Sequence, residues 1–355
     1  MAAMFGSAEP SLDEVSGNWL TFADRTRVAI SPHRIRDDVD RLPAPRNRQH
    51  SPEPMARADD ILIAALRDAG FVADRQVFQL RDVRGRLDYA VGPYPAGARA
   101  VTYQQLVGAN VVGIKHGVGS TDVILVGAHH DTIRDSPGAD DNTASVAAVL
   151  ELARVLAPHT FRDTIVLAAF DMEELSMFGS REMVGLLSKT RRVRGAIVYE
   201  TMAYTAAEPR TQRVPGGLGW VYPAQVGRIR RRECRGDWTA VLYRQSAIEM
   251  ARAFGGALAH AAGPDAPILL RDLRDLPVIG RLAGAIPFGG QFHRSDHLSF
   301  WNAGIPAILV TDTANFRNPH YHQPTDTPET LDYQRVAAIV EATAVTVAKL
   351  AGLRV

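Results

Sequence analysis

The feature that most constrains the fold is a regular alternation of short apolar runs with helical patterns between residues 122 and 203. The runs are rich in β-branched residues and span 123–126, 164–170 and 196–199. Patterns of helical spacing, such as the one over residues 146–153, lie between them. Short continuous apolar runs are typical of strands buried on both faces. The alternation therefore predicts βα units around a buried sheet, an α/β fold.

The rest of the chain extends this unit on both sides. A helical pattern covers residues 57–69, and a strand-like region follows over residues 71–115. Residues 205–290 are less regular and carry several Pro and Gly. Sheet-like sequence returns at residues 306–311, before a closing helix that is predicted over about residues 332–350.

Composition excludes several classes of partner and site. The chain has 355 residues, with 40 Lys and Arg against 39 Asp and Glu. This balance provides no general field for nucleic acid or an anionic membrane, so we expect neither as a partner. Cys234 is the single cysteine, which excludes an intramolecular disulfide and a cysteine-based metal cluster. Any metal must therefore be held by histidines and carboxylates.

The sequence contains no pattern of a targeting or membrane-spanning segment. Residues 1–19 lack a basic stretch followed by an apolar one, and acidic residues begin at Glu9. The longest apolar runs are strand-length and fall short of the roughly 18 residues that a spanning helix needs. We therefore expect a cytoplasmic protein. No pattern in the sequence specifies an oligomeric state.

Histidine and acidic side chains follow each of the predicted strands. They are His129, His130 and Asp131 after the first run, Asp140 and Asp141 before the next helix, Glu173 and Glu174 after the second run, Glu200 after the third, and His320 and His322 after the last. In open α/β sheets, functional groups collect at the carboxyl ends of strands, because the loops there meet at one crevice. We therefore expect these side chains to lie close together.

Together these side chains have the chemistry of a two-metal centre. Such a centre needs a bridging carboxylate, terminal histidine and carboxylate ligands, and a base for the water between the ions. The ligand roles can be filled by His129, Asp141, Glu174, Glu200 and His322. Glu173 diverges from its neighbour Glu174 in an extended segment, and is the predicted base. This ligand set suits Zn²⁺, with Mn²⁺ or Co²⁺ as substitutes.

Two acidic residues beside the predicted ligands have supporting or alternative roles. In an extended backbone, Asp131 lies on the same side as His129 and can hold its far ring nitrogen. We therefore assign Asp131 to the catalytic group, acting through His129. Asp140 is the next candidate for the bridging carboxylate after Asp141.

Other histidines and acids also have ordinary interpretations. His320 competes with His322 for one ligand role, and the spacing to the following Asp-Thr pair favours His322. We expect Asp296 and His297 to form a hydrogen-bonded pair that supports the site. A single histidine such as His129 is more often a core residue than a ligand, so only the combination of residues favours a metal site.

Five stretches of the sequence occur together, in the same order, in one known family. They are HHDT, PGADDN, the EE pair followed by FGS, SDHLSFWNAGIPA, and NPHYHQPTDT, and the resemblance covers residues 110–331. The chain resembles the zinc aminopeptidases typified by bacterial leucyl aminopeptidase, whose relatives include glutamate carboxypeptidase and glutaminyl cyclases.

The resemblance implies a role for each matching residue. The implied roles are His129 as first-site ligand, Asp141 as bridge, Glu173 as base, Glu174 as a ligand beside it, and His322 as second-site ligand. Family members commonly have Asp where this chain has Glu200. Two zinc ions are expected.

The resemblance also implies a fold and a domain organisation. We expect a three-layer α/β/α sandwich around a mixed, mostly parallel sheet. Residues 1–355 would form a single catalytic domain. Within it, 1–70 would be an N-terminal helical extension and 205–290 an elaboration over the active-site face.

The implied activity is hydrolysis of a peptide or amide bond, with removal of an N-terminal amino acid as the leading hypothesis. The alternatives are a carboxypeptidase-type amidohydrolase and a glutaminyl-cyclase-like aminoacyltransferase. Cyclase relatives usually carry Trp shortly after the EE pair, where this chain has Gly179. A non-enzymatic binding module is disfavoured by the complete ligand set. Residues 315–317, just before His322, are candidates for shaping the substrate pocket.

Overall fold

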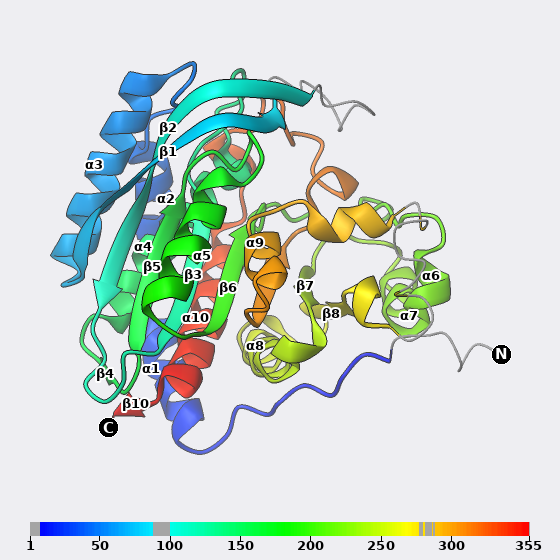
Figure 1. The fold of residues 1–355 in the computed structure, drawn as a ribbon. Coiled ribbons are helices and arrows are strands. Elements are labelled where there is room, and N and C mark those ends of the chain that lie inside the picture. The colour runs from blue at the N-terminus through cyan, green and yellow to red at the C-terminus, as the bar shows by residue number, and fades with distance from the viewer. Residues whose placement is uncertain (1–7, 88–99, 277–279, 281–285, 287, 355) are drawn as a thin grey trace.

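The computed structural model describes residues 8–87, 100–276, 280, 286 and 288–354. Within these residues, eight strands form one sheet in the order β1-β2-β5-β3-β6-β9-β7-β8 (Figure 1). They are β1 Val72–Arg86, β2 Ala100–Lys115, β3 Val123–His129, β5 Thr164–Phe170, β6 Val193–Glu200, β7 Thr239–Tyr243, β8 Pro267–Arg271 and β9 Ala307–Thr311. Strands β5, β3, β6 and β9 run parallel, whereas β1 with β2, β2 with β5, and β7 with β9 are antiparallel. A separate short pair joins β4 Thr160–Phe161 to β10 Leu353–Arg354.

Helices cover both faces of the sheet, which makes the fold a three-layer α/β/α sandwich (Figure 1). One layer contains α1 Asn18–Ala29, α2 Pro32–Arg41, α3 Pro52–Asp68, α4 Ala144–Leu156, α8 Ile248–Ala262 and α10 Tyr333–Ala351. The other contains α5 Phe178–Thr190, α6 Leu218–Val221, α7 Pro223–Arg231 and α9 His297–Asn302. The predicted fold class is therefore confirmed.

Alternating side chains along the central strands build one apolar core beneath each layer. In β3, Val123 and Leu125 pack into the core under α5 and α9, whereas Ile124 and Val126 pack under α4 and α10. All residues of β3 and β5 are buried, as expected of central parallel strands. Polar groups are thereby confined to the points where these strands end.

The two regions expected as additions contribute directly to the sandwich. The first helices, α1 to α3, lie in the same layer as α4 and α10 (Figure 1). Residues 205–290 supply β7 and β8 of the sheet and α8 of this layer, together with α6 and α7 on the opposite face. The division into one domain with two additions stays a prediction.

Strands β1 and β2 continue well past the central sheet. They pair along their full length, but β2 pairs with β5 only from Val111 to Lys115. The remaining half of the pair projects beyond the sheet (Figure 1). There, the backbone N–H of Arg86 donates to the carbonyl of Leu175 at 2.9 Å. The hairpin therefore reaches the loop that follows β5.

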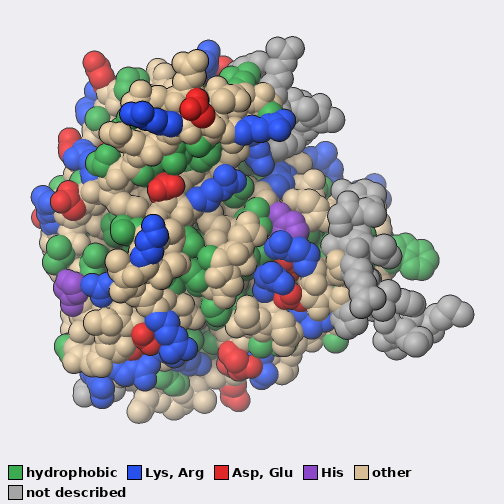
Figure 2. Space-filling model, in the orientation of Figure 1, with side chains coloured by type: hydrophobic (Ala, Val, Ile, Leu, Met, Phe, Trp, Pro, Cys, Tyr) green, Lys and Arg blue, Asp and Glu red, His purple; other side chains and the backbone are tan. Residues whose placement is uncertain are grey.

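The surface shows charges of both signs. On the face in Figure 2, basic and acidic side chains are interspersed with uncharged areas. In the part of the chain that the structure describes, no helix combines the length and the apolar composition that a membrane crossing requires.

Candidate metal centre

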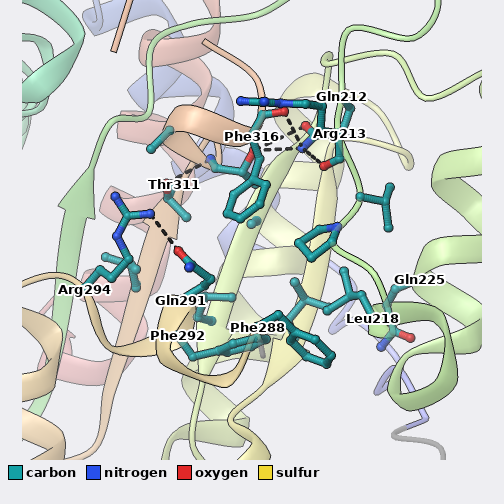
Figure 3. A pocket seen from close by; sticks show the side chains of 18 of the residues that line it. Gln212, Arg213, Leu218, Gln225, Phe288, Gln291, Phe292, Arg294, Thr311 and Phe316 are labelled. Atoms are coloured by element: carbon teal, nitrogen blue, oxygen red, sulfur yellow. Dashed lines mark hydrogen bonds between the residues drawn. The ribbon is translucent and has the colours of Figure 1, made fainter. Parts of the chain in front are cut away.

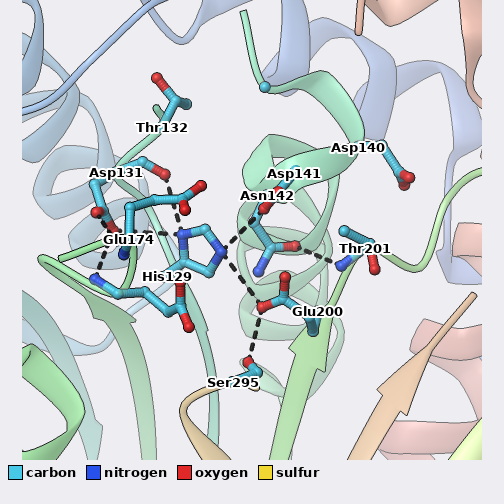
Figure 4. A network of polar contacts seen from close by, with 12 residues as sticks. His129, Asp131, Thr132, Asp140, Asp141, Asn142, Glu174, Glu200, Thr201 and Ser295 are labelled. Atoms are coloured by element: carbon cyan, nitrogen blue, oxygen red, sulfur yellow. Dashed lines mark hydrogen bonds and ion pairs between the residues drawn. The ribbon is translucent and has the colours of Figure 1, made fainter. Parts of the chain in front are cut away.

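The predicted ligands meet at one edge of the sheet because each follows the end of a strand or precedes a helix there. His129 is the last residue of β3, and Glu200 is the last residue of β6. Glu174 follows β5, Asp141 lies in the turn before α4, and His322 lies in the loop after β9. Because β3 and β6 are parallel neighbours, their carboxyl ends lie side by side, and Figure 4 shows His129 and Glu200 facing each other.

The five side chains form two groups that share Asp141. The first group is His129, Asp141 and Glu200, and the second is Asp141, Glu174 and His322. In the first, His129 Nε2 lies 3.2 Å from Asp141 Oδ1 and 3.3 Å from Glu200 Oε2. In the second, His322 Nε2 lies 3.1 Å from Asp141 Oδ2 and 3.6 Å from Glu174 Oε1. Asp141 thus presents one oxygen to each group.

These separations fit zinc. Zinc lies about 2.0–2.2 Å from nitrogen and oxygen ligands, so two tetrahedral ligands are separated by roughly 3.4 Å. Among the described residues, His129 Nε2, Asp141 Oδ1 and Glu174 Oε1 are buried and have no hydrogen-bond partner, although they face other polar atoms of the groups. Buried polar atoms of this kind require a partner. The donor set, two imidazoles and three carboxylates, therefore fits two zinc ions that share Asp141.

Asp131 connects the ligand His129 to the loop after β5. The Nδ1 atom of His129 lies 3.0 Å from the carbonyl oxygen of Asp131 and 3.4 Å from its Oδ1 atom. The Asp131 carboxylate also accepts the backbone N–H of Glu173 at 3.1 Å and of Glu174 at 3.2 Å. One side chain therefore orients a ligand and fixes the backbone of the predicted base.

Glu173 is a buried carboxylate that belongs to neither ligand group. Its side chain is buried and its Oε1 atom makes no hydrogen bond. Burial raises the pKa of Glu173 well above its usual range, and the nearby carboxylates of Glu200 and Asp296 add to the shift. A base with a raised pKa holds a proton more readily at neutral pH.

The electrostatics of the ligands reflect the crowding of acids and imidazoles. Burial alone would lower the pKa of His129, but Glu200, Asp131 and Asp141 outweigh it and raise this pKa well above its usual range. Burial opposes ionisation of Asp141, but His129 and His322 outweigh it and lower the pKa of this carboxyl. Divalent ions would take over this charge compensation.

The structure excludes Asp140 from the bridging position. Its Oδ1 atom accepts the backbone N–H of Ala203 at 2.9 Å, and its Oδ2 atom accepts Asn318 Nδ2 at 2.7 Å. The carboxylate therefore braces neighbouring loops. His320 likewise turns to Thr325, with its Nδ1 2.9 Å from the hydroxyl oxygen, and belongs to neither ligand group.

The Asp296 and His297 pair does not form. The Nε2 atom of His297 lies 2.8 Å from the carbonyl oxygen of Phe292, and both carboxylate oxygens of Asp296 are buried without a hydrogen bond. Burial raises the pKa of Asp296 to about 7, and Glu200 and Asp131 contribute to this rise. The prediction of a hydrogen-bonded pair is therefore wrong, because His297, at the start of α9, turns to the backbone of Phe292 instead of to Asp296.

Two supporting residues escaped the sequence analysis. Ser295 donates from Oγ to Glu200 Oε2 at 2.8 Å (Figure 4). Asp326 accepts the backbone N–H groups of Asp140 at 2.9 Å and Asp141 at 3.2 Å. Both lie within stretches that carried the resemblance, SDHLSF and PTDT, so the motifs contained a signal without specifying the contacts.

A cavity of about 120 Å³ opens next to Glu200. Its walls are mainly apolar and aromatic, and Figure 3 shows Leu218, Phe288, Phe292 and Phe316 around the space. Of the candidate loop, Phe316 lines the cavity, whereas Arg317 is buried behind it against the ring of Trp238, 4.8 Å from the ring centre. Asn315 is held by Arg213 and Arg294 at the rim.

Sequence comparison places the chain in a family. The profile of Peptidase family M28 matches residues 110–229 and 278–347, more than half of the chain. The chain belongs to peptidase family M28. The matched ranges include Glu173 and the five residues that form the two ligand groups.

The chain is also similar to individual proteins. The chain is 35% identical over 239 residues to the uncharacterised protein YfbL of Escherichia coli (strain K12), a match that covers 64% of this chain and 66% of that protein. It is 37% identical over 92 residues to aminopeptidase YwaD of Bacillus subtilis (strain 168), covering 25% and 20%. The chain thus spans less than two thirds of these relatives. The structure of a zinc aminopeptidase from Bacillus subtilis shares the fold, with a TM-score of 0.64, 15% identity, and 90% and 95% of the two chains covered.

Proposed function

We propose that this protein is a zinc-dependent aminopeptidase that removes an apolar N-terminal residue from a peptide. The observation that carries the proposal is the pair of ligand groups that share Asp141, with the buried carboxylate of Glu173 beside them. Membership of a peptidase family and the similarity to a relative named aminopeptidase support it.

Glu173 would move the proton in this reaction. Two zinc ions, when bound by the shared-Asp141 groups, would polarise the scissile carbonyl and lower the pKa of a water. Glu173 accepts the proton of that water at its carboxylate and returns it to the leaving amine. Asp131 keeps Glu173 in place because its carboxylate accepts the Glu173 backbone N–H.

The surroundings of the centre favour a free N-terminus as the bound group. Asp296 is a buried carboxylate, and lies within electrostatic reach of Glu173 and Glu200. A buried carboxylate outside the ligand groups, such as Asp296, attracts the ammonium group of a free N-terminus. A carboxypeptidase-type substrate, which brings its terminal carboxylate to the scissile bond, fits this setting less well.

The apolar cavity beside Glu200 defines the proposed side-chain preference. A side chain that enters it leaves water and contacts Leu218, Phe288, Phe292 and Phe316. Burial of apolar surface contributes about 25 cal/mol per Å². Leucyl, methionyl and phenylalanyl substrates should therefore be cleaved better than alanyl or charged ones.

The glutaminyl-cyclase alternative is disfavoured by the packing at Gly179. A Cβ atom at this position would lie 2.3 Å from both Asn110 Oδ1 and the carbonyl oxygen of Asp171. No side chain fits there, so the Trp of the cyclase relatives has no counterpart at this point. The chain therefore differs from the cyclase relatives at this position.

Metal analysis combined with a substrate panel tests the proposal. The panel contains aminoacyl amides, their N-acetylated forms, dipeptides with a free C-terminal carboxylate, and a glutaminyl amide. We expect two zinc ions per chain, cleavage of free aminoacyl amides with apolar side chains, and no cleavage once the amine is acetylated. Preferential cleavage of the acetylated forms would contradict an aminopeptidase, and pyroglutamate from the glutaminyl amide would indicate a cyclase.

A further inference from the structure

The loop before α3 contacts the carboxyl end of β3, although the two segments are far apart in the sequence. Arg46 is fully buried, and its Nε atom donates to the carbonyl oxygen of His130 at 2.5 Å. Its Nη2 atom donates to Thr143 Oγ1 at 2.7 Å, and Nη1 donates to the carbonyl oxygen of Pro43 at 3.1 Å. One guanidinium therefore joins the segment after His129 to the helix start after Asp141.

The Arg46 backbone strengthens the same connection. Its N–H donates to Thr132 Oγ1 at 3.1 Å, and its carbonyl oxygen accepts the N–H of Thr132 at 2.8 Å. Burial lowers the pKa of Arg46 to about 10, and the neighbouring Asp131 limits this shift. The buried charge thus lies beside the carboxylate that orients His129.

A second arginine of the same loop connects to the strand that precedes Glu173. Arg48 is paired with Asp171, the residue that follows β5. It also donates to Asp59 Oδ2 at 2.8 Å, and to the carbonyl oxygen of Ala109 at 3.0 Å. The Oδ1 atom of Asp59 in turn lies 3.0 Å from His130 Nε2.

These contacts reach both strand ends that carry the proposed ligands and base. His130 is adjacent to His129, and Asp171 is two residues before Glu173. The other ring nitrogen of His130, Nδ1, lies 2.7 Å from the carbonyl oxygen of Phe170, so this ring also connects β3 to β5. The family match begins only at residue 110, so Arg46, Arg48 and Asp59, which contact these strand ends, lie outside it.

We propose that Arg46 and Arg48 are positioning residues of the metal centre, which hold His129, Asp131 and Glu173 through the backbone of the two strand ends. The proposal rests on the proposed function, because it presupposes that the ligand groups bind metal. Partners that orient ligands from behind typically change metal affinity by about 10- to 100-fold when they are removed. Arg46 and Arg48 act at one further step, through the backbone, so we expect the lower end of this range.

The test is a titration of metal-free protein with Co²⁺, followed through the visible absorption of the bound ion. The variants are Arg46→Lys and Arg48→Lys, which keep the charge but replace a forked donor by a single ammonium. We expect both to bind Co²⁺ about tenfold more weakly than wild type, with an altered absorption spectrum. The far-ultraviolet circular dichroism should remain that of wild type.

Arg34 provides a matched control from the same part of the chain. Its side chain donates to the buried carboxylate of Glu151 in α4, at 2.8 Å from Nε to Oε2, and to the carbonyl oxygen of Ala29 at 2.8 Å. It therefore tethers α2 to the core without touching the strand ends. Arg34→Lys should lower the unfolding temperature but leave Co²⁺ affinity and the absorption spectrum unchanged.

The Co²⁺ affinities and spectra of these variants distinguish failure of this proposal from failure of the proposed function. Wild-type affinity and spectrum in both Arg46→Lys and Arg48→Lys would overturn this proposal alone, as would an equal loss of affinity in Arg34→Lys. Failure of the wild type to bind Co²⁺ would overturn the proposed function as well. If Arg46→Lys does not fold, Arg48→Lys and Asp59→Asn decide. The second of these weakens the contact with His130 while preserving the shape of the side chain.

Discussion

Two regions on opposite sides of the candidate metal centre support it by different physical means. The loop over residues 43–51 contacts the ends of β3 and β5 with the buried Arg46, the partly buried Arg48 and directed hydrogen bonds. Residues 205–290 supply an apolar wall beside Glu200, through Leu218, Trp238 and Phe288. Hydrogen bonds fix positions, whereas apolar surface selects for size and polarity. The first region should therefore determine how well the metals bind, and the second which substrate is cleaved.

The largest effect is expected at the base that lies between the two regions. Glu173→Gln preserves the shape of the side chain but removes its ability to accept a proton at neutral pH. We expect a fall in kcat of about 10²- to 10⁴-fold with unchanged metal content, and by the same factor for every substrate. Steady-state kinetics with several aminoacyl amides measure this. A variant that retains half of the wild-type kcat would remove Glu173 from the mechanism.

Changes in the ligands should affect metal content before selectivity. Asp141→Asn removes the negative charge that both groups share, whereas His129→Ala removes a ligand of one group only. Two dications about 3.5–4 Å apart need a bridging anion, so the Asn variant should lose more metal. Elemental analysis after dialysis compares the two. Two tightly bound ions in Asp141→Asn would show that Asp141 does not bridge.

A change in the apolar wall should alter selectivity while leaving the metal centre intact. Ala240 of β7 lines the cavity, and Ala240→Leu fills part of it. Loss of room for a few methylene groups changes discrimination by about 10- to 100-fold, so the preference for leucyl over alanyl amides should fall by this factor. The ratio of the two kcat/KM values measures it. Equal losses of kcat/KM on leucyl and alanyl amides would contradict the assignment of substrate selection to residues 205–290.

Glu200 lies in neither region but takes part in both a ligand group and the cavity wall, and the smallest graded effects are expected there. It faces His129 in one ligand group and also lines the cavity. Glu200→Asp keeps the charge and shifts the oxygens by about one methylene, whereas Glu200→Gln removes a charge beside a dication. Metal affinity should therefore decrease from wild type to Asp to Gln. Calorimetric titration tests this order, and equal affinities would place Glu200 outside the ligand set.

The convergence of the proposed ligands could be predicted because one rule covers most of them. His129, Glu174 and Glu200 each lie at or just after the end of an apolar run that is typical of a buried strand. The carboxyl ends of parallel strands lie together at one end of the sheet. The α/β class followed from the same alternation, whereas the three-layer sandwich was implied by the family resemblance. The chemistry of each residue was visible in the sequence, and the topology then brought the residues together.

The supporting contacts were harder to predict because they join residues far apart in the chain. Arg46 and Thr143 are separated by 97 positions, and Ser295 and Glu200 by 95. No periodicity links such pairs. The strand β7 was also hidden, because five buried residues within a Gly- and Pro-rich region do not display a period. The cavity was invisible for the same reason, since its walls come from several separated segments.

The antiparallel pairing of β1 with β2 has a practical consequence for dissecting the molecule. The segment that sequence comparison marks as the family begins at residue 110, which lies within β2 rather than at a boundary. A fragment that started there would cut this strand, remove its partner β1, and expose the edge of the remaining β2 residues, which pair with β5 from Val111 to Lys115. The smallest part of the chain that can fold on its own is therefore larger than the part that matches the family. Truncations designed from similarity alone should give aggregating protein, because an unpaired strand edge recruits other chains.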